Sequence, residues 1–189
     1  GTPKSGVGPH DVALSIVGAV YANGYVKNKV MEFVGPGIEY LSMEYRNAID
    51  VMTTETSCWS SIWVTDDKTR DYLALHGREN DWKALQPGDI TFYDGCIYVD
   101  LSTIECTIAM PMHPSNIFTI HELQENAQDI LHEVEKKANA QIQGASMDLV
   151  SKYHDGAIWT DQGEIAGCAG GTFENICAAA DILRGQSCG

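Results

Sequence analysis

Cys168 lies in the stretch of this sequence that is best suited to chemistry, residues 163–177. Ile165 and Ala166 before it have the character of a buried strand end, and a helix is predicted to begin at Thr172. Glycines flank the cysteine on both sides: Gly167, Gly170 and Gly171. A thiol on an exposed turn beside a helix N-terminus is favoured as the thiolate, the form that attacks electrophiles or binds metals.

The residues alone leave three interpretations of Cys168 open. As a metal ligand it needs further ligands, and neither Cys177 nor Cys188 has a spacing that matches a known cluster motif. As a nucleophile it needs a base, for which His154 is the nearest histidine in the sequence. The third interpretation is a thiol that packs at a tight turn and does no chemistry.

Glu55 is the second candidate for chemistry. It is the only acid between Asp50 and Asp66, and it stands among short hydroxyl side chains: Thr53, Thr54, Thr56 and Ser57. We expect this polar segment to fray from the end of a helix into a loop. A carboxylate in that place can act as a general acid or base, or bind a metal-bound water. The alternative is a solvated carboxylate near a helix end.

The remaining motifs carry little functional information. The turn at residues 35–37, Gly-Pro-Gly, lacks the third glycine of a dinucleotide fingerprint and the lysine of a Walker motif, so we interpret it as a tight turn. The histidines show neither HxH nor HExxH spacing. They therefore do not indicate a histidine metal site.

Composition narrows the choice of partners. The 189 residues include 12 basic and 26 acidic side chains, which give a net charge of −14. We therefore expect neither nucleic acid nor an anionic membrane as a partner, because both require clustered Lys and Arg. A hydrophobic fraction of 44% and a charged fraction of 20% are ordinary for a globular protein.

We expect a cytoplasmic protein with reduced cysteines. No apolar run approaches the roughly 20 residues of a membrane helix, and no signal peptide is recognised. No cysteine pair has CxxC spacing. Most of the remaining cysteines are predicted to be small core residues: Cys58, Cys96, Cys106 and Cys177.

Helical and strand patterns alternate through the first half of the chain. The apolar spacing predicts helices over residues 9–22, 38–52 and 66–76, and strands over residues 30–34 and 61–65. Asp66 or Asp67 is expected to cap the third of these helices. This alternation predicts an α/β architecture with a mainly parallel sheet.

The second half is organised differently. Strands are predicted over residues 96–101 and 103–108, followed by a proline-containing crossing at residues 110–115 and a charged helix from Thr119. We expect that helix to reach residue 143 or to break near Lys137. The predicted domains are residues 1–117, an α/β domain, and residues 118–189, a linker helix and the truncated start of the next α/β domain.

Three passages resemble the aconitase superfamily of iron–sulfur hydratases. Residues 2–14 are similar to its "T-G-K…S-P-K-D-V" segment, residues 33–39 to "F-G-P-G-V-E", and residues 165–168 to "I-G-S-C-T-N". The ungapped spacing after the second passage places Glu55 on the glutamate of the family's "N-M-x-x-E" motif. The resemblance covers nearly the whole chain, with the passages in the family's order.

The resemblance implies a fold, a cofactor and roles for both candidates. The fold is a three-layer α/β/α sandwich with a mainly parallel sheet, like the aconitase iron–sulfur domains. Cys168 is a ligand of a [4Fe-4S] cluster whose open iron acts as a Lewis acid, and Glu55 helps to move a proton. The substrate is a small hydroxycarboxylic acid. Val51, Ala169 and Gly170 replace polar residues of the family motifs, which indicates a divergent branch.

The resemblance also implies that the chain is a fragment, the second domain and the start of the third. The other cluster cysteines and further domains of the parent would be its partners, and we expect the isolated fragment to bind no cluster and to be inactive. Two other functions stay open. One is a cysteine-dependent hydrolase or transferase in which His154 serves Cys168 as base, and the other is a non-catalytic domain that retains the fold.

Overall fold

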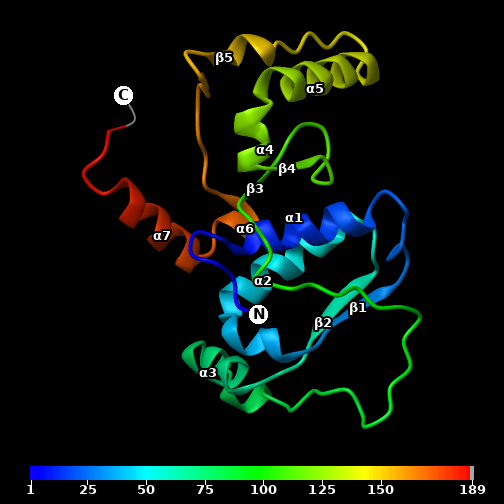
Figure 1. Cartoon of the computed structure of the whole chain (residues 1–189). Coiled ribbons are helices and arrows are strands. Elements are labelled where there is room, and N and C mark those ends of the chain that lie inside the picture. The colour runs from blue at the N-terminus through cyan, green and yellow to red at the C-terminus, as the bar shows by residue number, and fades with distance from the viewer. Residues whose placement is uncertain (188–189) are drawn as a thin grey trace.

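The computed structural model describes residues 1–187 and contains seven α-helices and six short strands within them (Figure 1). In chain order the elements are α1 (Pro9–Val20), β1 (Val30–Phe33), α2 (Met43–Met52), β2 (Ser60–Trp63), α3 (Asp67–Leu75), β3 (Thr107–Ala109), β4 (Ile117–Thr119), α4 (Ile120–Glu125), α5 (Ala127–Gln141), β5 (Tyr153–His154), β6 (Ala157–Ile158), α6 (Gly167–Gly170) and α7 (Phe173–Leu183). Short 3₁₀ turns connect several of them: η1 (Pro36–Tyr40), η2 (Thr53–Thr56), η3 (Glu79–Asp81) and η4 (Val150–Lys152).

The first two helices begin where their capping residues stand. Pro9 is the first residue of α1, and the Asp11 carboxylate accepts a hydrogen bond of 2.7 Å from the backbone N–H of Gly8. The helix predicted over residues 38–52 begins later, at Met43. There the Ser42 hydroxyl accepts from the Tyr45 N–H at 3.1 Å, because an N-cap serine outweighs the apolar pattern before it.

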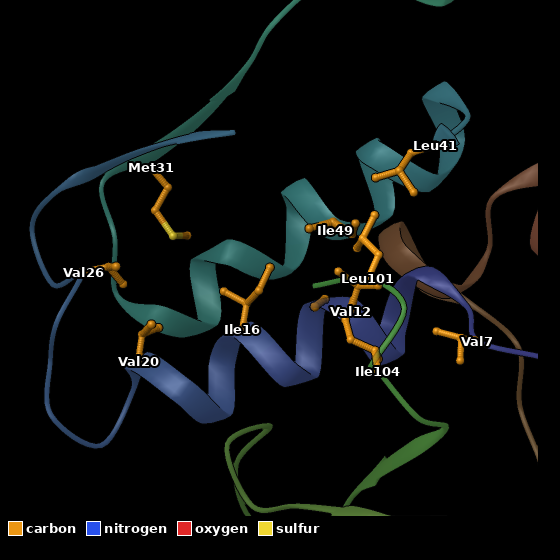
Figure 2. Packing of buried hydrophobic residues seen from close by; sticks show 11 residues of the cluster. Val7, Val12, Ile16, Val20, Val26, Met31, Leu41, Ile49, Leu101 and Ile104 are labelled. Atoms are coloured by element: carbon orange, nitrogen blue, oxygen red, sulfur yellow. The ribbon is translucent and has the colours of Figure 1, made fainter. Parts of the chain in front are cut away.

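The main core lies between α1, α2 and the β1–β2 pair. Figure 2 shows Val12 and Ile16 of α1 and Ile49 of α2 pointing into the space between the two helices. Leu101 and Ile104 close the cluster from the segment before β3. Burying each such aliphatic side chain stabilises the fold by about 1.5–3 kcal/mol, so this core fixes the relative position of the two helices.

The sheets are small. The described residues form three sheets of two strands each, and only β1 and β2 pair in parallel, with Val30 opposite Ser60 and Phe33 opposite Trp63. The mixed helix and strand content agrees with the predicted α/β class. The three-layer sandwich with a mainly parallel sheet is not confirmed by these residues and stays a prediction.

The strand predicted over residues 96–101 is wrong. These residues have no regular secondary structure, although Ile97, Val99 and Leu101 pack against the main core. The alternation of apolar residues therefore arises because one face of the segment is buried against the helices. In the described part of the chain, no strand pairs with this segment.

A second core lies beyond β3, on the other side of α1 from β1 and β2 (Figure 1). Met110, Leu123, Leu131 and Val134 form it. The helix predicted from Thr119 is confirmed, with Thr119 as N-cap, but it is divided at Asn126 into α4 and α5. The domain division between residues 117 and 118 stays a prediction.

The cysteines are more exposed than predicted. Cys96, Cys106 and Cys177 are exposed, whereas Cys58 is partly buried against the main core. The prediction that these cysteines are core residues is therefore wrong for the three exposed ones. Cys188 lies outside the described residues. Between residues 1 and 187, no helix is long and apolar enough to cross a membrane.

Candidate functional site

Glu55 lies on η2, the 3₁₀ turn that continues α2. The neighbouring hydroxyls hydrogen-bond to the backbone: Thr53 Oγ1 donates to the Asp50 carbonyl at 2.7 Å and Thr56 Oγ1 to the Thr53 carbonyl at 2.6 Å. Ser57 ends the turn in the left-handed region, with φ of 61°. The predicted frayed loop is therefore an ordered turn, and it presents the Glu55 side chain at its surface with 44% exposure.

His113 faces Glu55 across the gap between η2 and the β3–β4 loop. Its Nε2 lies 4.0 Å from Oε2 of Glu55, and its side chain is 33% exposed. The imidazole stacks on the ring of Tyr21, the residue that follows the last residue of α1, with ring centroids 3.9 Å apart and planes 24° apart. The pair is thus held at the C-terminal end of α1.

Hydrogen bonds fix the tautomer of the neutral His113 ring. The backbone N–H of Ser115 donates to His113 Nδ1 at 3.1 Å, and the Ser115 hydroxyl lies 3.0 Å from the same nitrogen. A backbone N–H can only donate, so Nδ1 accepts and carries no proton. The ring proton is therefore on Nε2, the nitrogen that faces Glu55.

Cys168 lies on α6, a single helical turn, and its side chain is exposed. Gly167 before it has a φ of +82°, a conformation that glycine adopts without strain. The predicted strand end at Ile165 and Ala166 is not formed, and Ala166 is the extended N-cap of α6. The predicted helix start is confirmed, because Thr172 is the N-cap of α7.

The structure does not bring Cys168 and Glu55 together. A Cβ placed on Gly170 would lie 3.7 Å from Cε1 of His10, so α6 stands at the N-terminal end of α1. Figure 2 shows its ribbon at the same end, beyond Val12. Glu55 stands at the other end of the 12-residue α1, and a helix of that length spans about 18 Å.

Polar contacts with the start of α2 hold α7 in this position. The Ser42 hydroxyl donates to Oε2 of Glu174 at 2.5 Å, and the backbone N–H of Glu174 donates to Oε2 of Glu44 at 2.6 Å. Helix α7 itself buries no residue, whereas α6 packs on α2 and buries Ala169, the residue after Cys168. The packing of α6 on α2, together with the hydrogen bonds of α7, therefore determines where Cys168 lies.

The described residues do not fit a complete iron–sulfur cluster. No group of three or more His, Cys, Asp or Glu side chains in residues 1–187 could hold a metal ion, whereas such a cluster is bound by several thiolates. Cys168 is exposed, and open space surrounds the Cβ position of Gly167 before it. These two features would allow Cys168 to be one ligand of a cluster whose other ligands come from elsewhere.

His154 is not placed as a base for Cys168. It belongs to β5, where its ring stacks on Trp159 with centroids 5.3 Å apart and its Nδ1 lies 3.2 Å from Asp155. In Figure 1, β5 stands well apart from α6. The geometry gives the cysteine-dependent hydrolase no support.

A cavity of about 390 Å³ lies elsewhere, between α1, the segment before β3 and the start of α4. Its polar lining residues include Ser15, Asp100, Glu105 and Glu122. Neither Glu55 nor Cys168 lines it. It is therefore not the site that the sequence predicts.

Reasoning from the sequence did not identify His113. His113 shares no metal-binding spacing with another histidine, and its partner Glu55 lies far away in the chain. One local signal was available: His113 stands between Pro111 and Pro114 in the crossing segment, where prolines restrict the backbone. Only the packing of the β3–β4 loop against the end of α1 brings the two side chains together.

Comparison with known proteins shows what this chain is similar to. The model of the aconitase family (aconitate hydratase) matches residues 1–189. The 2,3-dimethylmalate dehydratase large subunit of Eubacterium barkeri is 30% identical over 186 residues, which are 98% of this chain and 36% of the relative.

Two further relatives are both named as large subunits of 3-isopropylmalate dehydratase. The 3-isopropylmalate dehydratase large subunit of Clostridium botulinum (strain Alaska E43 / Type E3) is 38% identical over 62% of this chain and 28% of the relative. The subunit of the same name from Clostridium beijerinckii is 29% identical over 97% of this chain and 36% of the relative. The chain thus spans 36% of the length of relatives that match nearly all of it.

Proposed function

The chain belongs to the aconitase family, and on that premise we propose that it is part of a hydro-lyase that adds water to, or removes it from, a small hydroxydicarboxylic acid. The observation that carries this proposal is the similarity of nearly the whole chain to dehydratase large subunits. The presentation of Glu55 on an ordered turn beside a histidine agrees with it.

We propose an alkyl-substituted malate as the substrate. The relatives are named for 2,3-dimethylmalate and 3-isopropylmalate, both of which carry apolar groups on a malate skeleton. This chain has Val51, Ala169 and Gly170 where the family motifs carry polar residues. Loss of polar groups favours a substrate with an alkyl group over a tricarboxylate, because a polar substituent would leave hydrogen bonds unmade.

Glu55 is the proton carrier in this proposal. In the dehydration direction the C–O bond breaks and the hydroxyl leaves as water, so a general acid must supply one proton to that oxygen. The α-proton leaves to a second base, which we propose lies outside residues 1–187. Positioned acid–base groups of this kind contribute roughly 10²- to 10⁴-fold to the rate. In the hydration direction the same carboxylate accepts the proton from water.

Cys168 is proposed as one ligand of a [4Fe-4S] cluster, with the other ligands coming from residues outside 1–187. When bound, such a cluster supplies a Lewis-acidic iron that polarises a substrate oxygen. A joint site requires Cys168 and Glu55 to lie close together. We therefore propose that the α6–α7 segment takes another position in the complete protein, where neighbouring domains or a second subunit cover α7.

Turnover by the complete protein tests this function. The protein that contains this chain is purified anaerobically, reconstituted with iron and sulfide, and incubated with 2,3-dimethylmalate, 3-isopropylmalate and citrate. The conjugated double bond of the product is followed by ultraviolet absorbance. We expect turnover of a substituted malate in preference to citrate. Absence of turnover with all three acids would contradict the proposal.

A further inference from the structure

We propose that His113 is a positioning residue for Glu55, an assignment that rests on the proposed function. In this proposal the imidazole donates its Nε2–H to the Glu55 carboxylate in the reacting complex, which orients the carboxylate and stabilises its negative charge. Nothing in the sequence motifs assigns this histidine a role. The inference comes from the contact between two segments far apart in the chain, 4.0 Å between Nε2 and Oε2.

The β3–β4 loop is built to hold the ring in place. The Met110 N–H donates to the Asn116 carbonyl at 2.8 Å, and the Asn116 N–H donates to the His113 carbonyl at 2.9 Å. The Asn116 side-chain amide donates to the Pro111 carbonyl at 2.8 Å. These bonds close the loop on itself, so the backbone of His113 is fixed independently of Glu55.

One face and one edge of the ring also have partners. Its face stacks on Tyr21, and its Nδ1 accepts from the Ser115 backbone. The remaining polar position, Nε2–H, has the Glu55 carboxylate as its neighbour. A separation of 4.0 Å exceeds the length of a hydrogen bond, but catalytic hydrogen bonds are often long before substrate binds and shorten in the reacting complex.

A second Glu–His pair provides a matched comparison. His121 and Glu125 face each other on α4 with Nε2 and Oε1 3.4 Å apart, yet their side chains are 72% and 62% exposed. That pair is an ordinary helix-surface contact. The Glu55–His113 pair joins separate elements and is more enclosed, with exposures of 44% and 33%.

Nitrogen NMR of this chain tests the geometry without any activity. With ¹⁵N-labelled histidine at alkaline pH, we expect His113 to carry its proton on Nε2 and not on Nδ1. Glu55→Gln should shift the Nε2–H resonance of His113, whereas Glu125→Gln should leave it unchanged. A ring protonated on Nδ1, a mixture of tautomers, or no response to Glu55→Gln would overturn the proposal.

Kinetics of the complete protein on 2,3-dimethylmalate and 3-isopropylmalate test the role. His113→Phe keeps a ring to stack on Tyr21 but removes both nitrogens, and we expect kcat to fall about 10- to 100-fold with little change in KM. His113→Gln restores an N–H donor near the Nε2 position and should recover part of the loss. His121→Phe is the control and should retain full activity.

The outcomes distinguish the proposed role of His113 from the proposed function and its use of Glu55. If Glu55→Gln abolishes turnover while His113→Phe behaves like His121→Phe, the role of His113 is wrong and the proposed function stands. If Glu55→Gln turns over normally, the proposed role of Glu55 is wrong, and that of His113 with it. Combining His113→Phe with Glu55→Gln should add little to the loss from Glu55→Gln alone, because both changes act on one proton transfer.

Discussion

At the scale of single residues, hydroxyl groups determine how Glu55 is presented. The threonines around it hydrogen-bond to backbone carbonyls and close a 3₁₀ turn, so the carboxylate itself stays free of them. The sequence indicated Glu55 as a candidate but predicted a frayed loop around it. Short polar side chains hydrogen-bond to the backbone in irregular loops and in ordered turns, so their presence does not distinguish the two. Its partner His113 was beyond prediction because the contact is tertiary.

Cys168 and Cys177 provide a direct test of the proposed cluster ligand. Both are free and exposed in the structure, so they differ in position and not in accessibility. In the complete protein, reconstituted anaerobically, we expect Cys168→Ser to lose the iron–sulfur absorbance and most of the bound iron, because serine is a poor substitute for a thiolate ligand. Cys177→Ser should keep both. Equal iron contents in the two variants would exclude Cys168 as a ligand.

At the scale of elements, one buried arginine joins the start of α3 to α2. The Arg46 guanidinium donates to both carboxylate oxygens of Asp66, at 2.5 and 3.1 Å, and to the Ile38 carbonyl at 3.0 Å. Its side chain is only 1% exposed. Asp66 in turn caps α3 by accepting from the Thr69 N–H, so the cap predicted from the sequence also anchors the helix.

Removal of this guanidinium should be costly. We expect Arg46→Ala to lower the free energy of unfolding by about 3 kcal/mol, because it removes a buried guanidinium that pairs with the partly exposed Asp66 and leaves a cavity. Arg70→Ala, which removes exposed contacts with Asp67 and Asp71, should cost less than about 1 kcal/mol. Urea denaturation measures both. Similar losses of unfolding free energy in the two variants would show that the Arg46–Asp66 contact stabilises the fold no more than an exposed ion pair does.

Asp66 should make this link sensitive to acid. Its burial raises its pKa, but the hydrogen bonds from Arg46 and Thr69 outweigh burial and hold the pKa below the usual 3.8. A carboxyl whose pKa is lower in the folded state stabilises the fold above its unfolded pKa, and this stabilisation is lost as the pH falls through the folded pKa. Below pH 3.8 the link should therefore weaken progressively.

The comparison of Asp66→Asn with the unchanged chain measures this effect. Asparagine retains the helix cap and removes the titrating charge. The difference in unfolding free energy should be largest near neutral pH and should shrink as the pH falls below about 4. A difference that does not change between pH 7 and pH 3 would contradict the assignment.

Capping residues and apolar spacing made several elements predictable. Pro9, Asp66, Thr119 and Thr172 each mark the start of a helix in the structure. Asp66 and Thr119 do so through side-chain cap hydrogen bonds, and Pro9 through its fixed backbone angle at the first helical position. Pairing of strands was less predictable, because it depends on a neighbour that the local sequence does not specify. Residues 96–101 have strand-like alternation but pack against helices without a strand partner.

At the scale of the whole molecule, the two ends of α1 carry the two candidate residues. Glu55 and His113 stand at its C-terminal end, and Cys168 stands beside its N-terminus. The Glu55–His113 position rests on the main core. The position of Cys168 rests on the packing of α6 against α2 and on polar contacts of α7 with the start of α2. Phe173 and Ile182 on α7 are 74% and 76% exposed.

Hydrogen exchange should reveal this difference in anchoring. Amides of α7 are expected to exchange fast in the isolated chain, because the helix buries no residue. Amides of α1 and α2, whose apolar faces form the main core, should be protected. In the complete protein we expect α7 to become protected as other domains cover it. Strong protection of α7 in the isolated chain would contradict the proposed repositioning.

The dehydration rate of the complete protein after a change at Glu55 tests the central claim most directly. Glu55→Gln preserves shape and removes the titratable oxygen, while Glu125→Gln makes the same change in the exposed Glu–His pair of α4. With 2,3-dimethylmalate or 3-isopropylmalate, we predict a fall in kcat of about 10²- to 10⁴-fold for Glu55→Gln and an unchanged kcat for Glu125→Gln. An unchanged kcat in Glu55→Gln would contradict the account.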